Sequence, residues 1–338
     1  MAAASTGRPK LLLVSLGGTI TMTASGGPGI VPTLTGADLV AAVPALADVA
    51  DIEAISPFRL PGPSLTLAHL RNVAMLLNER MTGDVAGAIV VQGTDTIEET
   101  AFVLDCLVGG DKPVVITGAM RGAEAPGADG PANLLASAIV ASSQAARGLG
   151  ALVVLNETIH AARFVQKAST FLPSTFASFS AGPLGYVIEG EARIDMRVVR
   201  TSVIQGGDRG SDQPVALLTA ALGDDGRMLI GLPGLAYRGL VVEAMGVGHV
   251  PASIVPALAT LTESIPVVLS SRVPSGSIFS RTYGFAGSET DLLARGLIPS
   301  GALGGLKARL LLSLLLGVGL QDDELRGAFV GIADPSKR

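Results

Sequence analysis

One stretch of the sequence, residues 88–108, reads AIVVQGTDTIEETAFVLDCLV. It begins with a short, continuous apolar run, Ala88–Val91, of the kind that forms a buried strand. A polar turn follows, and then Thr96–Val108, an amphipathic segment long enough for three turns of helix. The stretch therefore predicts a strand, a turn and a helix, which is the first part of a βαβ unit.

The same order recurs on both sides of this stretch. Further strands are predicted at Lys10–Leu16, Pro113–Thr117 and Ala151–Leu155, and further helices at Thr66–Met81 and Gly130–Arg147. Strands that alternate with helices favour right-handed crossovers and a parallel sheet covered on both faces. The predicted fold class is α/β, with a larger N-terminal parallel-sheet domain of the flavodoxin/Rossmann-like type.

A second, smaller α/β domain is predicted after a break in this rhythm. Residues Ala168–Gln213 are rich in Ser, Thr, Gly and Phe, and predict loops or hairpins followed by a linker. Alternation then resumes, with strands at Pro214–Thr219, Gly239–Met245 and Ile265–Ser271 and helices near Ala252–Thr262, Leu303–Leu316 and Asp322–Phe329. The predicted domains are residues 1–205 and 206–338.

Composition excludes several classes of protein. Of the 338 residues, 48% are hydrophobic and 16% charged, which is too apolar for disorder, and a net charge of −5 disfavours a nucleic-acid surface. The single cysteine, Cys106, excludes an intramolecular disulfide and is expected in the core. The longest apolar stretch, Leu310–Leu320, is too short to span a bilayer, and Met1–Lys10 lacks the apolar run of a secretory signal. We expect a cytoplasmic protein that binds neither nucleic acid nor membrane.

Two turns at predicted strand ends carry candidate functional groups. Gly17-Gly18-Thr19 follows the first strand, at the edge where open α/β sheets place ligands. Its spacing does not fit a dinucleotide-binding loop, and it lacks the lysine of a phosphate-binding loop. Residues 21–35 are small and turn-forming, as is typical of a mobile lid.

The second turn is Gly93–Thr96, at the start of a predicted helix. Thr96 and Glu99 have the spacing of a capping box, which leaves Thr94 and Asp95 without a structural explanation. A hydroxyl and a carboxylate beside a helix N-terminus are suited to hold an amine and to activate water. An isolated lysine is usually a surface charge, but Lys167, if buried near a threonine, would serve as a general base.

Other catalytic machinery is missing from the sequence. The three histidines, His69, His160 and His249, do not have metal-ligand spacing, and there is no G-x-S-x-G motif. A nucleophile in this chain is therefore expected to be a hydroxyl that is activated in some other way.

Several motifs together resemble the bacterial-type L-asparaginase family over nearly the whole chain. Besides Gly17-Gly18-Thr19 and Gly93–Thr100, the motifs are Gly118-Ala119-Met120-Arg121, Asp129-Gly130-Pro131-x-Asn133-Leu134, Gly182–Tyr186 and Ser270–Gly276. The resemblance implies hydrolysis of the side-chain amide of L-asparagine to L-aspartate and ammonia, with neither a metal nor an organic cofactor.

The resemblance also implies a role for each matching residue. Thr19 matches the nucleophile that forms a β-acyl-enzyme, and Lys167 matches the base that deprotonates Thr94 or its water. Asp95 would also bind the substrate α-ammonium, and the carbonyl of Ala119 would accept from the substrate amide. The N–H groups of Thr19 and Thr94 would form the oxyanion hole.

Two further positions are implied in substrate binding. Gly93 belongs to the matching motif, and Ser56 falls where the family places a serine that binds the substrate carboxylate. The family also places active sites between subunits of a tetramer built from paired dimers, which implies a homo-oligomer, either a tetramer or a dimer.

The chain departs from the family pattern at several positions. Many members carry a lid tyrosine near the first threonine, whereas residues 20–35 contain none and offer the hydroxyls of Thr21, Thr23 and Ser25 instead. Pro57 follows Ser56 where many members have Gln or Asp. In the second domain His249 replaces an asparagine, and either Glu289 or Tyr283 would take the place of an acidic residue supplied by a neighbouring subunit.

Two other functions remain open. One is the amide-hydrolysing subunit of a tRNA-dependent amidotransferase, which shares the fold and motifs but would carry an extra N-terminal domain. The other is an amino-acid-binding member of the family that has lost turnover together with the lid tyrosine.

Overall fold

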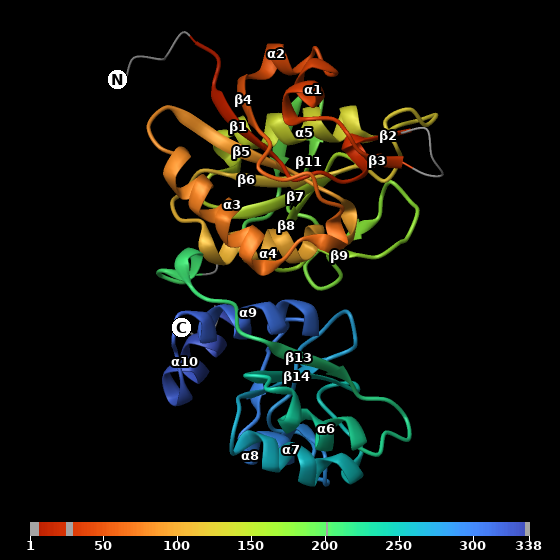
Figure 1. The fold of residues 1–338 in the computed structure, drawn as a ribbon, viewed down its shortest axis with the longest axis vertical. Helices are drawn as coiled ribbons and strands as arrows, with labels where there is room; N and C mark the ends of the chain where they lie inside the picture. Colours follow the sequence, from red (N-terminus) through yellow and green to blue (C-terminus); the bar gives the residue numbers. More distant parts are fainter. Residues whose placement is uncertain (1–6, 25–29, 201, 335–338) are drawn as a thin grey trace. The chain divides into compact units, whose positions relative to one another are not determined.

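The structure is a computed structural model that describes residues 7–24, 30–200 and 202–334. The chain divides into two compact units, Met1–Val203 and Ile204–Arg338 (Figure 1). Each unit has its own sheet and its own helices.

A single large sheet forms the centre of the first unit. Its strands, in spatial order, are β12 (Glu191–Ile194), β11 (Gly185–Ile188), β8 (Thr158–Ala161), β7 (Ala151–Leu155), β6 (Val114–Thr117), β5 (Val85–Val91), β1 (Lys10–Ser15) and β4 (Asp51–Ile55). The five strands from β7 to β4 are parallel, and β8, β11 and β12 continue the sheet in antiparallel pairs. The predicted α/β class with a parallel sheet is confirmed.

The strand order places a topological switch point between β1 and β5. From β1 the chain crosses to β4 on one side, and it then returns to β5 on the other side. In open α/β sheets, ligands bind outside the carboxyl ends of the two strands where the order reverses. Ser15 of β1 pairs with Val91 of β5, so the segments that follow these strands start side by side.

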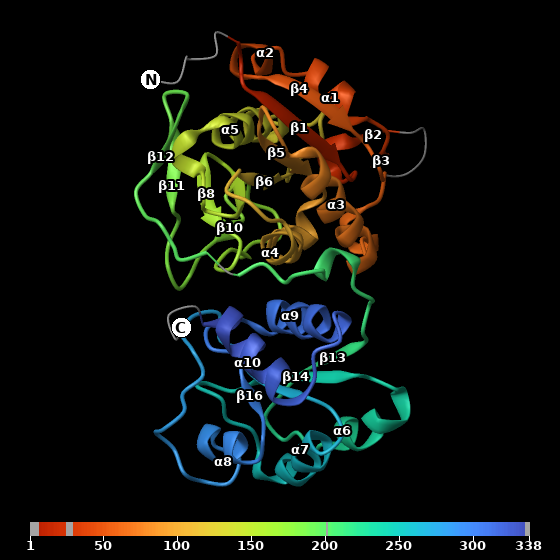
Figure 2. The same ribbon diagram turned by 90° about the vertical axis from the view of Figure 1, so that its left-hand side faces the viewer.

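Helices cover both faces of this sheet (Figure 2). They are α1 (Gly36–Ala41), α2 (Leu46–Val49) and α5 (Gly130–Ser142) on one face, and α3 (Leu67–Arg80) and α4 (Ile97–Leu107) on the other. Leu11 and Leu13 pack with the first group, and the alternation of a strand directs Leu12 and Val14 to the opposite face. Because both faces are covered, the strands are continuously apolar, which made them predictable.

The predicted helix starts are right for α3 and only partly right for α4. Thr66 caps α3 by accepting from the N–H of His69. The capping box expected of Thr96 and Glu99 is wrong, because the side chain of Thr96 makes no cap hydrogen bond. Thr96 instead donates to the carbonyl of Gly62, and residues 94–96 form a 3₁₀ turn before the helix.

Helix α5 is shorter than the predicted Gly130–Arg147. Ser143 has an extended backbone (φ −77°, ψ 131°), which ends the helix at Ser142, and Gln144–Ala146 form a separate 3₁₀ turn. In the described part of the chain, no helix combines the length and apolar character needed to cross a bilayer.

The segment that breaks the alternation forms hairpins, as predicted. Two short strands, β9 (Gln166–Lys167) and β10 (Phe176–Ala177), pair with each other outside the large sheet, and β11 and β12 form its antiparallel edge. A further short pair, β2 (Met22–Ala24) and β3 (Ile30–Pro32), follows the first turn.

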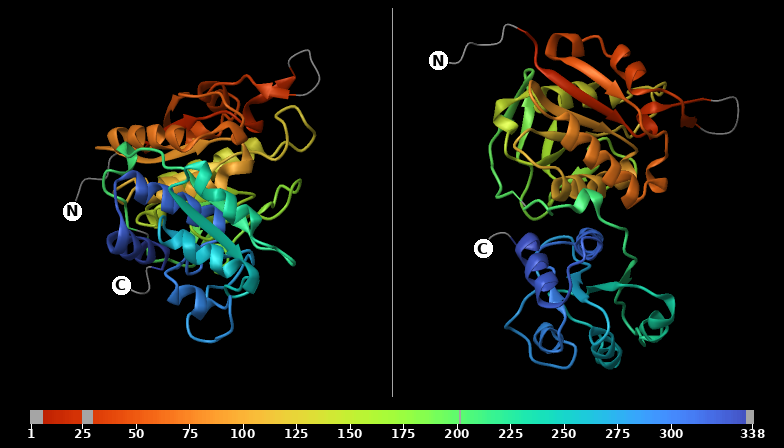
Figure 3. Two further views of the ribbon diagram at one scale, coloured as in Figure 1. Left: turned by 60° about the horizontal axis from the view of Figure 1, so that its bottom comes forward. Right: turned by 60° about the vertical axis from the view of Figure 1, so that its left-hand side comes forward.

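The second unit contains a four-stranded parallel sheet. Its strands, in order, are β13 (Val215–Thr219), β14 (Gly239–Ala244), β15 (Val267–Ser271) and β16 (Ile298–Pro299). Its helices are α6 (Arg227–Gly231), α7 (Val255–Thr262) and α8 (Glu289–Ala294) on one side, and α9 (Gly305–Gly317) and α10 (Asp322–Ala333) on the other (Figure 3). The resumed alternation of strands and helices is therefore confirmed.

Candidate functional site

Two glycines bring the turns after β1 and β5 into backbone contact. A Cβ atom on Gly18 would overlap the backbone nitrogen and Cα of Gly93, so only glycine permits this approach. Gly18 also has φ 91° and ψ 179°, a backbone conformation that residues other than glycine rarely adopt. The contact fixes the two turns against each other at the switch point.

The two candidate threonines hold equivalent positions in these turns. Thr19 is the first residue of the 3₁₀ turn η1 (Thr19–Thr21), and Thr94 is the first residue of η3 (Thr94–Thr96). The first N–H of a helical turn has no partner within that turn, so both backbone donors are available to a ligand. Thr19 is half-buried and Thr94 is 6% exposed.

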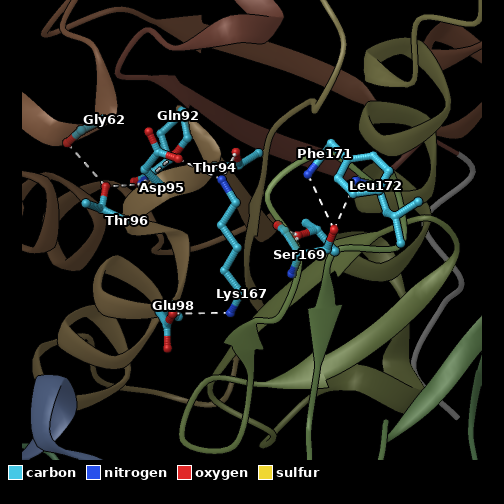
Figure 4. Close-up of polar contacts among 12 residues, drawn as sticks. Gly62, Gln92, Thr94, Asp95, Thr96, Glu98, Lys167, Ser169, Phe171 and Leu172 are labelled. Atoms are coloured by element: carbon cyan, nitrogen blue, oxygen red, sulfur yellow. Dashed lines mark hydrogen bonds and ion pairs between the residues drawn. The ribbon is translucent and has the colours of Figure 1, made fainter.

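Lys167 contacts the second threonine group directly (Figure 4). Its Nζ donates to Thr94 Oγ1 over 2.9 Å and to Asp95 Oδ1 over 2.6 Å. The lysine side chain is 17% exposed, whereas that of Asp95 is 62% exposed. The lysine side chain is therefore held within the site, and the carboxylate of Asp95 keeps an open side.

The backbone around Lys167 is held from two directions. Its N–H donates to Glu98 Oε1 of α4 over 3.2 Å, and the residue pairs with Phe176 across the β9–β10 ladder. Glu98 is part of the Gly93–Thr100 motif, and no role was expected for it. Directly before this motif, Gln92 Nε2 donates to Thr96 Oγ1 and to the carbonyl of Gly93, which fixes the turn.

The loop Gly118–Arg121 lies beside Thr94. A Cβ on Gly118 would come within 3.4 Å of the Thr94 methyl group, and Ala119 is fully buried. Asp129 holds the loop by accepting from the N–H groups of Met120 and Arg121, both over 2.9 Å.

Asn133 completes this support. Its Nδ2 donates to the carbonyl of Gly118 over 2.9 Å and to Asp129 Oδ2 over 3.1 Å. The sequence identified Asp129 and Asn133 as motif residues, and the structure gives them a role in holding the Ala119 loop.

Ser56 lies outside this group of contacts. Its Oγ accepts from the N–H of Gly36 over 2.9 Å, at the start of α1. The 3₁₀ turn η2 (Gly62–Ser64) approaches Gly93 instead, since a Cβ on Gly62 would come within 3.2 Å of the Gly93 carbonyl. The structure thus brings Gly62, rather than Ser56, to the second turn. The signal for this segment in the sequence is the Pro-Gly-Pro pattern of residues 61–63, which is typical of a turn.

Of the three hydroxyls considered in place of a lid tyrosine, Thr21 is committed elsewhere. It is fully buried and donates its proton to the carbonyl of Gly18 over 2.7 Å. The hydroxyl of Thr21 therefore shapes the turn that carries Thr19. The side chain of Thr23 and the whole of Ser25 lie outside the described residues.

In the second unit, His249, Glu289 and Tyr283 form one cluster. Glu289 is fully buried and accepts from the N–H groups of Thr282 and Tyr283, over 2.9 and 2.8 Å, and its carboxylate lies 3.3 Å from His249 Nε2. Burial by itself raises the pKa of Glu289, but these donors outweigh it and hold the pKa below its ordinary value. Tyr283 is 42% exposed and meets the His249 ring edge-on. Glu289 thus supports the loop, and Tyr283 is the member of the pair that reaches the surface.

Cys106 is fully buried in α4, and burial raises the pKa of its thiol well above the ordinary value, as expected of an unreactive core residue. Among the residues that the structure describes, no group of three or more His, Cys, Asp and Glu side chains is placed to hold a metal ion.

Comparison with known proteins assigns the family. Residues 10–200 match the model "Asparaginase, N-terminal", and residues 214–329 match the model "Glutaminase/Asparaginase C-terminal domain". The "Probable L-asparaginase" of Deinococcus radiodurans is 37% identical, over 95% of this chain and 97% of that protein. "L-asparaginase 2" of Escherichia coli is 31% identical, over 91% of this chain and 89% of that protein.

A solved structure has the same fold. It is that of the "Probable Cytoplasmic L-asparaginase" from Campylobacter jejuni, with a TM-score of 0.86, 28% identity, and coverage of 96% of this chain and 99% of that one. The two family models together cover most of the sequence, including both turns and Lys167. The chain belongs to the asparaginase family.

Proposed function

We propose that the chain is an L-asparaginase, which hydrolyses the side-chain amide of L-asparagine to L-aspartate and ammonia. The observation that carries the proposal is the contact of Lys167 Nζ with both Thr94 and Asp95, in a turn fixed against the one that bears Thr19. Family membership supports the same reaction.

The first step is acyl transfer to Thr19. Its hydroxyl oxygen attacks the amide carbon and its proton leaves to a base, which forms a tetrahedral intermediate. The N–H groups of Thr19 and Thr94 stabilise the oxyanion, because both begin a helical turn and point their donors outward. When the C–N bond breaks, the nitrogen takes up the proton that the base removed from Thr19 and leaves as ammonia, and the acyl group remains as an ester on Thr19.

The second step is hydrolysis of this ester. Lys167, in its neutral form, takes a proton from Thr94, which in turn takes one from water, and the resulting hydroxide attacks the ester carbon. The 2.9 Å separation between Nζ and Oγ1 supports this transfer because it lies within hydrogen-bond reach. Breaking the ester bond releases aspartate, and the proton held by Lys167 returns through Thr94 to the Thr19 oxygen, which restores the Thr19 hydroxyl and the neutral lysine.

Substrate binding uses the remaining groups of the site. The exposed carboxylate of Asp95 is suited to hold the substrate α-ammonium, since its open oxygen does not contact Lys167. The carbonyl of Ala119, in the loop held by Asp129 and Asn133, accepts from the substrate amide nitrogen. The backbone of Gly62 and Gly93 forms the adjoining wall.

The proposal is tested by following ammonia and aspartate release from L-asparagine. Loss of a hydroxyl that serves both proton transfer and positioning costs about 10²–10⁴-fold in kcat, so Thr94→Val is expected to lose nearly all activity. Thr94→Ser, which keeps the hydroxyl, is the matched control and retains a measurable part.

Equal release by the wild type and Thr94→Val contradicts the proposal. Tight aspartate binding without turnover by the wild type also contradicts it, and would instead indicate an amino-acid-binding member of the family.

We also propose that the protein is a cytoplasmic homo-oligomer, either a dimer or a tetramer. The name of the Campylobacter jejuni relative supports the location. Four apolar side chains of residues 222–235, Leu222, Met228, Ile230 and Leu235, are 65–98% exposed in the second unit, as is typical of surfaces that become buried on assembly. Sedimentation velocity measures the state directly, and a monomer at micromolar concentration contradicts this part.

A further inference from the structure

A buried histidine lies outside the proposed chemistry. His160 stands in the middle of β8, opposite Val153 of β7, and is 3% exposed. Its Nδ1 is 2.9 Å from the hydroxyl of Ser178, and its buried Nε2 has no hydrogen-bond partner among the described residues.

Burial lowers the pKa of His160 to about 4. The imidazole is therefore neutral near pH 7 and acts there as a fixed hydrogen-bonding group. The tautomer with its proton on Nδ1 donates to Ser178 and leaves only a lone pair unpaired at Nε2, which costs less than an unpaired buried N–H.

Ser178 connects this histidine to the strand that faces Lys167. It directly follows β10, whose Phe176 pairs with Lys167 of β9. Its carbonyl also accepts from the N–H of Gly182 over 2.8 Å, at the turn through which the chain enters β11. The His160–Ser178 contact therefore marks the place where the β9–β10 hairpin joins the large sheet.

The hairpin depends on such an anchor. Each of its strands is two residues long, and an isolated two-stranded ladder is marginally stable even when it is longer. One further backbone hydrogen bond, from the N–H of Ala168 to the carbonyl of Thr175 over 2.7 Å, extends the ladder, and the tip of the loop is exposed at Phe171, to 74%. Glu98 holds β9 through the N–H of Lys167, and the contact of Ser178 with His160 lies at the end of β10.

We propose that His160 is a positioning residue for Lys167, which it acts on through Ser178 and the β9–β10 ladder. The inference rests on the proposed function, because it assigns His160 to the placement of the proposed base. Misplacement of a catalytic group by about 1 Å costs roughly 10²-fold in rate. Loss of a contact that fixes the hairpin is therefore expected to lower kcat strongly.

A double-mutant cycle separates this role from a general structural one. Ser178→Ala and His160→Leu are each expected to lower kcat about 10- to 100-fold, with a smaller change in KM. In a Lys167→Met background, Ser178→Ala is expected to have no further effect on the residual rate, because the group it positions is already gone. His160→Asn, whose amide nitrogen lies near the place of Nδ1, is expected to restore much of the rate.

A matched control tests whether loss of any buried serine contact produces the effect. Ser313 in α9 is 6% exposed and donates to the carbonyl of Gln213 over 2.7 Å. Ser313→Ala is expected to lower the unfolding midpoint to a similar degree as Ser178→Ala, while its kcat stays at the wild-type value.

A measurement without substrate gives an independent readout. The sequence contains five lysines, Lys10, Lys112, Lys167, Lys307 and Lys337, so the signal of Lys167 in lysine-labelled protein can be assigned by NMR from Lys167→Met. Ser178→Ala is expected to shift the Lys167 side-chain signal and leave that of Lys112 unchanged.

The results that would overturn the positioning role differ from those that would overturn the proposed function. Wild-type kcat in Ser178→Ala and His160→Leu, with an unshifted Lys167 signal, overturns the positioning role even if Thr94→Val is inactive. An equal loss from Ser178→Ala with and without Lys167 also overturns it. Full activity of Thr94→Val and Lys167→Met overturns the proposed function, and the inference about His160 falls with it.

Discussion

The side-chain nitrogen of Lys167 lies 2.9 Å from the hydroxyl oxygen of Thr94, although the two residues are 73 positions apart along the chain. Thr94 stands at the carboxyl end of a parallel strand, where α/β sheets are expected to place ligands. Lys167 comes from a short hairpin outside that sheet. The site thus combines a rigid switch point with one group that is supplied by a less regular segment.

Replacing Lys167 tests whether the site needs a side chain that can accept a proton from Thr94. Lys167→Met is expected to lower kcat by about 10²–10⁴-fold, because it removes both the base and the contact with Asp95. Lys167→Arg keeps a hydrogen-bond donor at this place, but its guanidinium stays protonated and cannot accept a proton near neutral pH, so the variant is expected to remain nearly as impaired. Steady-state ammonia release measures both variants, and an arginine variant with wild-type kcat contradicts the assignment of a base.

Gly18 tests the contact that joins the two turns. Gly18→Ala places a methyl group against the backbone of Gly93 and forces alanine into a conformation with φ 91°. We expect the free energy of unfolding to fall by at least about 2 kcal/mol, together with most of the activity. Gly109→Ala is the control, since no atom lies within 4 Å of the added carbon. Urea unfolding compares the two variants, and equal stability would mean that the turns are not held as described.

Acid sensitivity tests the burial of His160. Its pKa is about 4 in the folded protein, against an ordinary value of 6.5. As the pH falls below 6.5, the imidazole becomes protonated in the unfolded chain, whereas in the folded chain it stays neutral until about pH 4. The free energy of unfolding is therefore highest above pH 6.5 and falls as the pH is lowered from 6.5 to 4. Between pH 7 and pH 5 this one group accounts for a loss of about 2 kcal/mol.

The matched variant is His160→Asn, which has no group that titrates in this range. It is expected to lose about 2 kcal/mol less than the wild type between the two pH values. Urea unfolding at pH 7 and pH 5 gives the comparison. Identical losses in the two proteins would show that the imidazole is accessible to protons in the folded state.

The main strands could be predicted because their environment leaves a simple pattern. A strand such as β5 is covered on both faces and is therefore continuously apolar, and a glycine turn marks its end. β4 was not predicted, because it is the edge strand and alternates exposed with half-buried residues over Asp51–Ile55. β8 was also not predicted. The tight turn that leads into it from β7 consists of Asn156 and Glu157, both with positive φ, and lacks the glycine by which such turns are usually identified.

The candidate site was predictable to the extent that its groups lie within motifs. Thr94 and Asp95 were found because their turn follows a strand, and Lys167 was considered as an isolated lysine whose role the family resemblance then implied. Ser56 was placed by position along the chain, whereas the approach of Gly62 to Gly93 depends on how residues 56–64 fold back over the sheet. Thr96 shows the same limit, since its hydroxyl bonds to Gly62 rather than to its own helix.

The most direct test of the central claim is to identify the residue that carries the acyl group. Lys167→Met is mixed with L-asparagine, quenched, and examined by intact-mass and peptide mass spectrometry. Because activation of water is impaired while Thr19 is unchanged, the account predicts one aspartyl group per chain, in ester linkage to Thr19. An aspartyl group on Thr94 or another residue, or an unmodified enzyme that turns over at the wild-type rate, would contradict it.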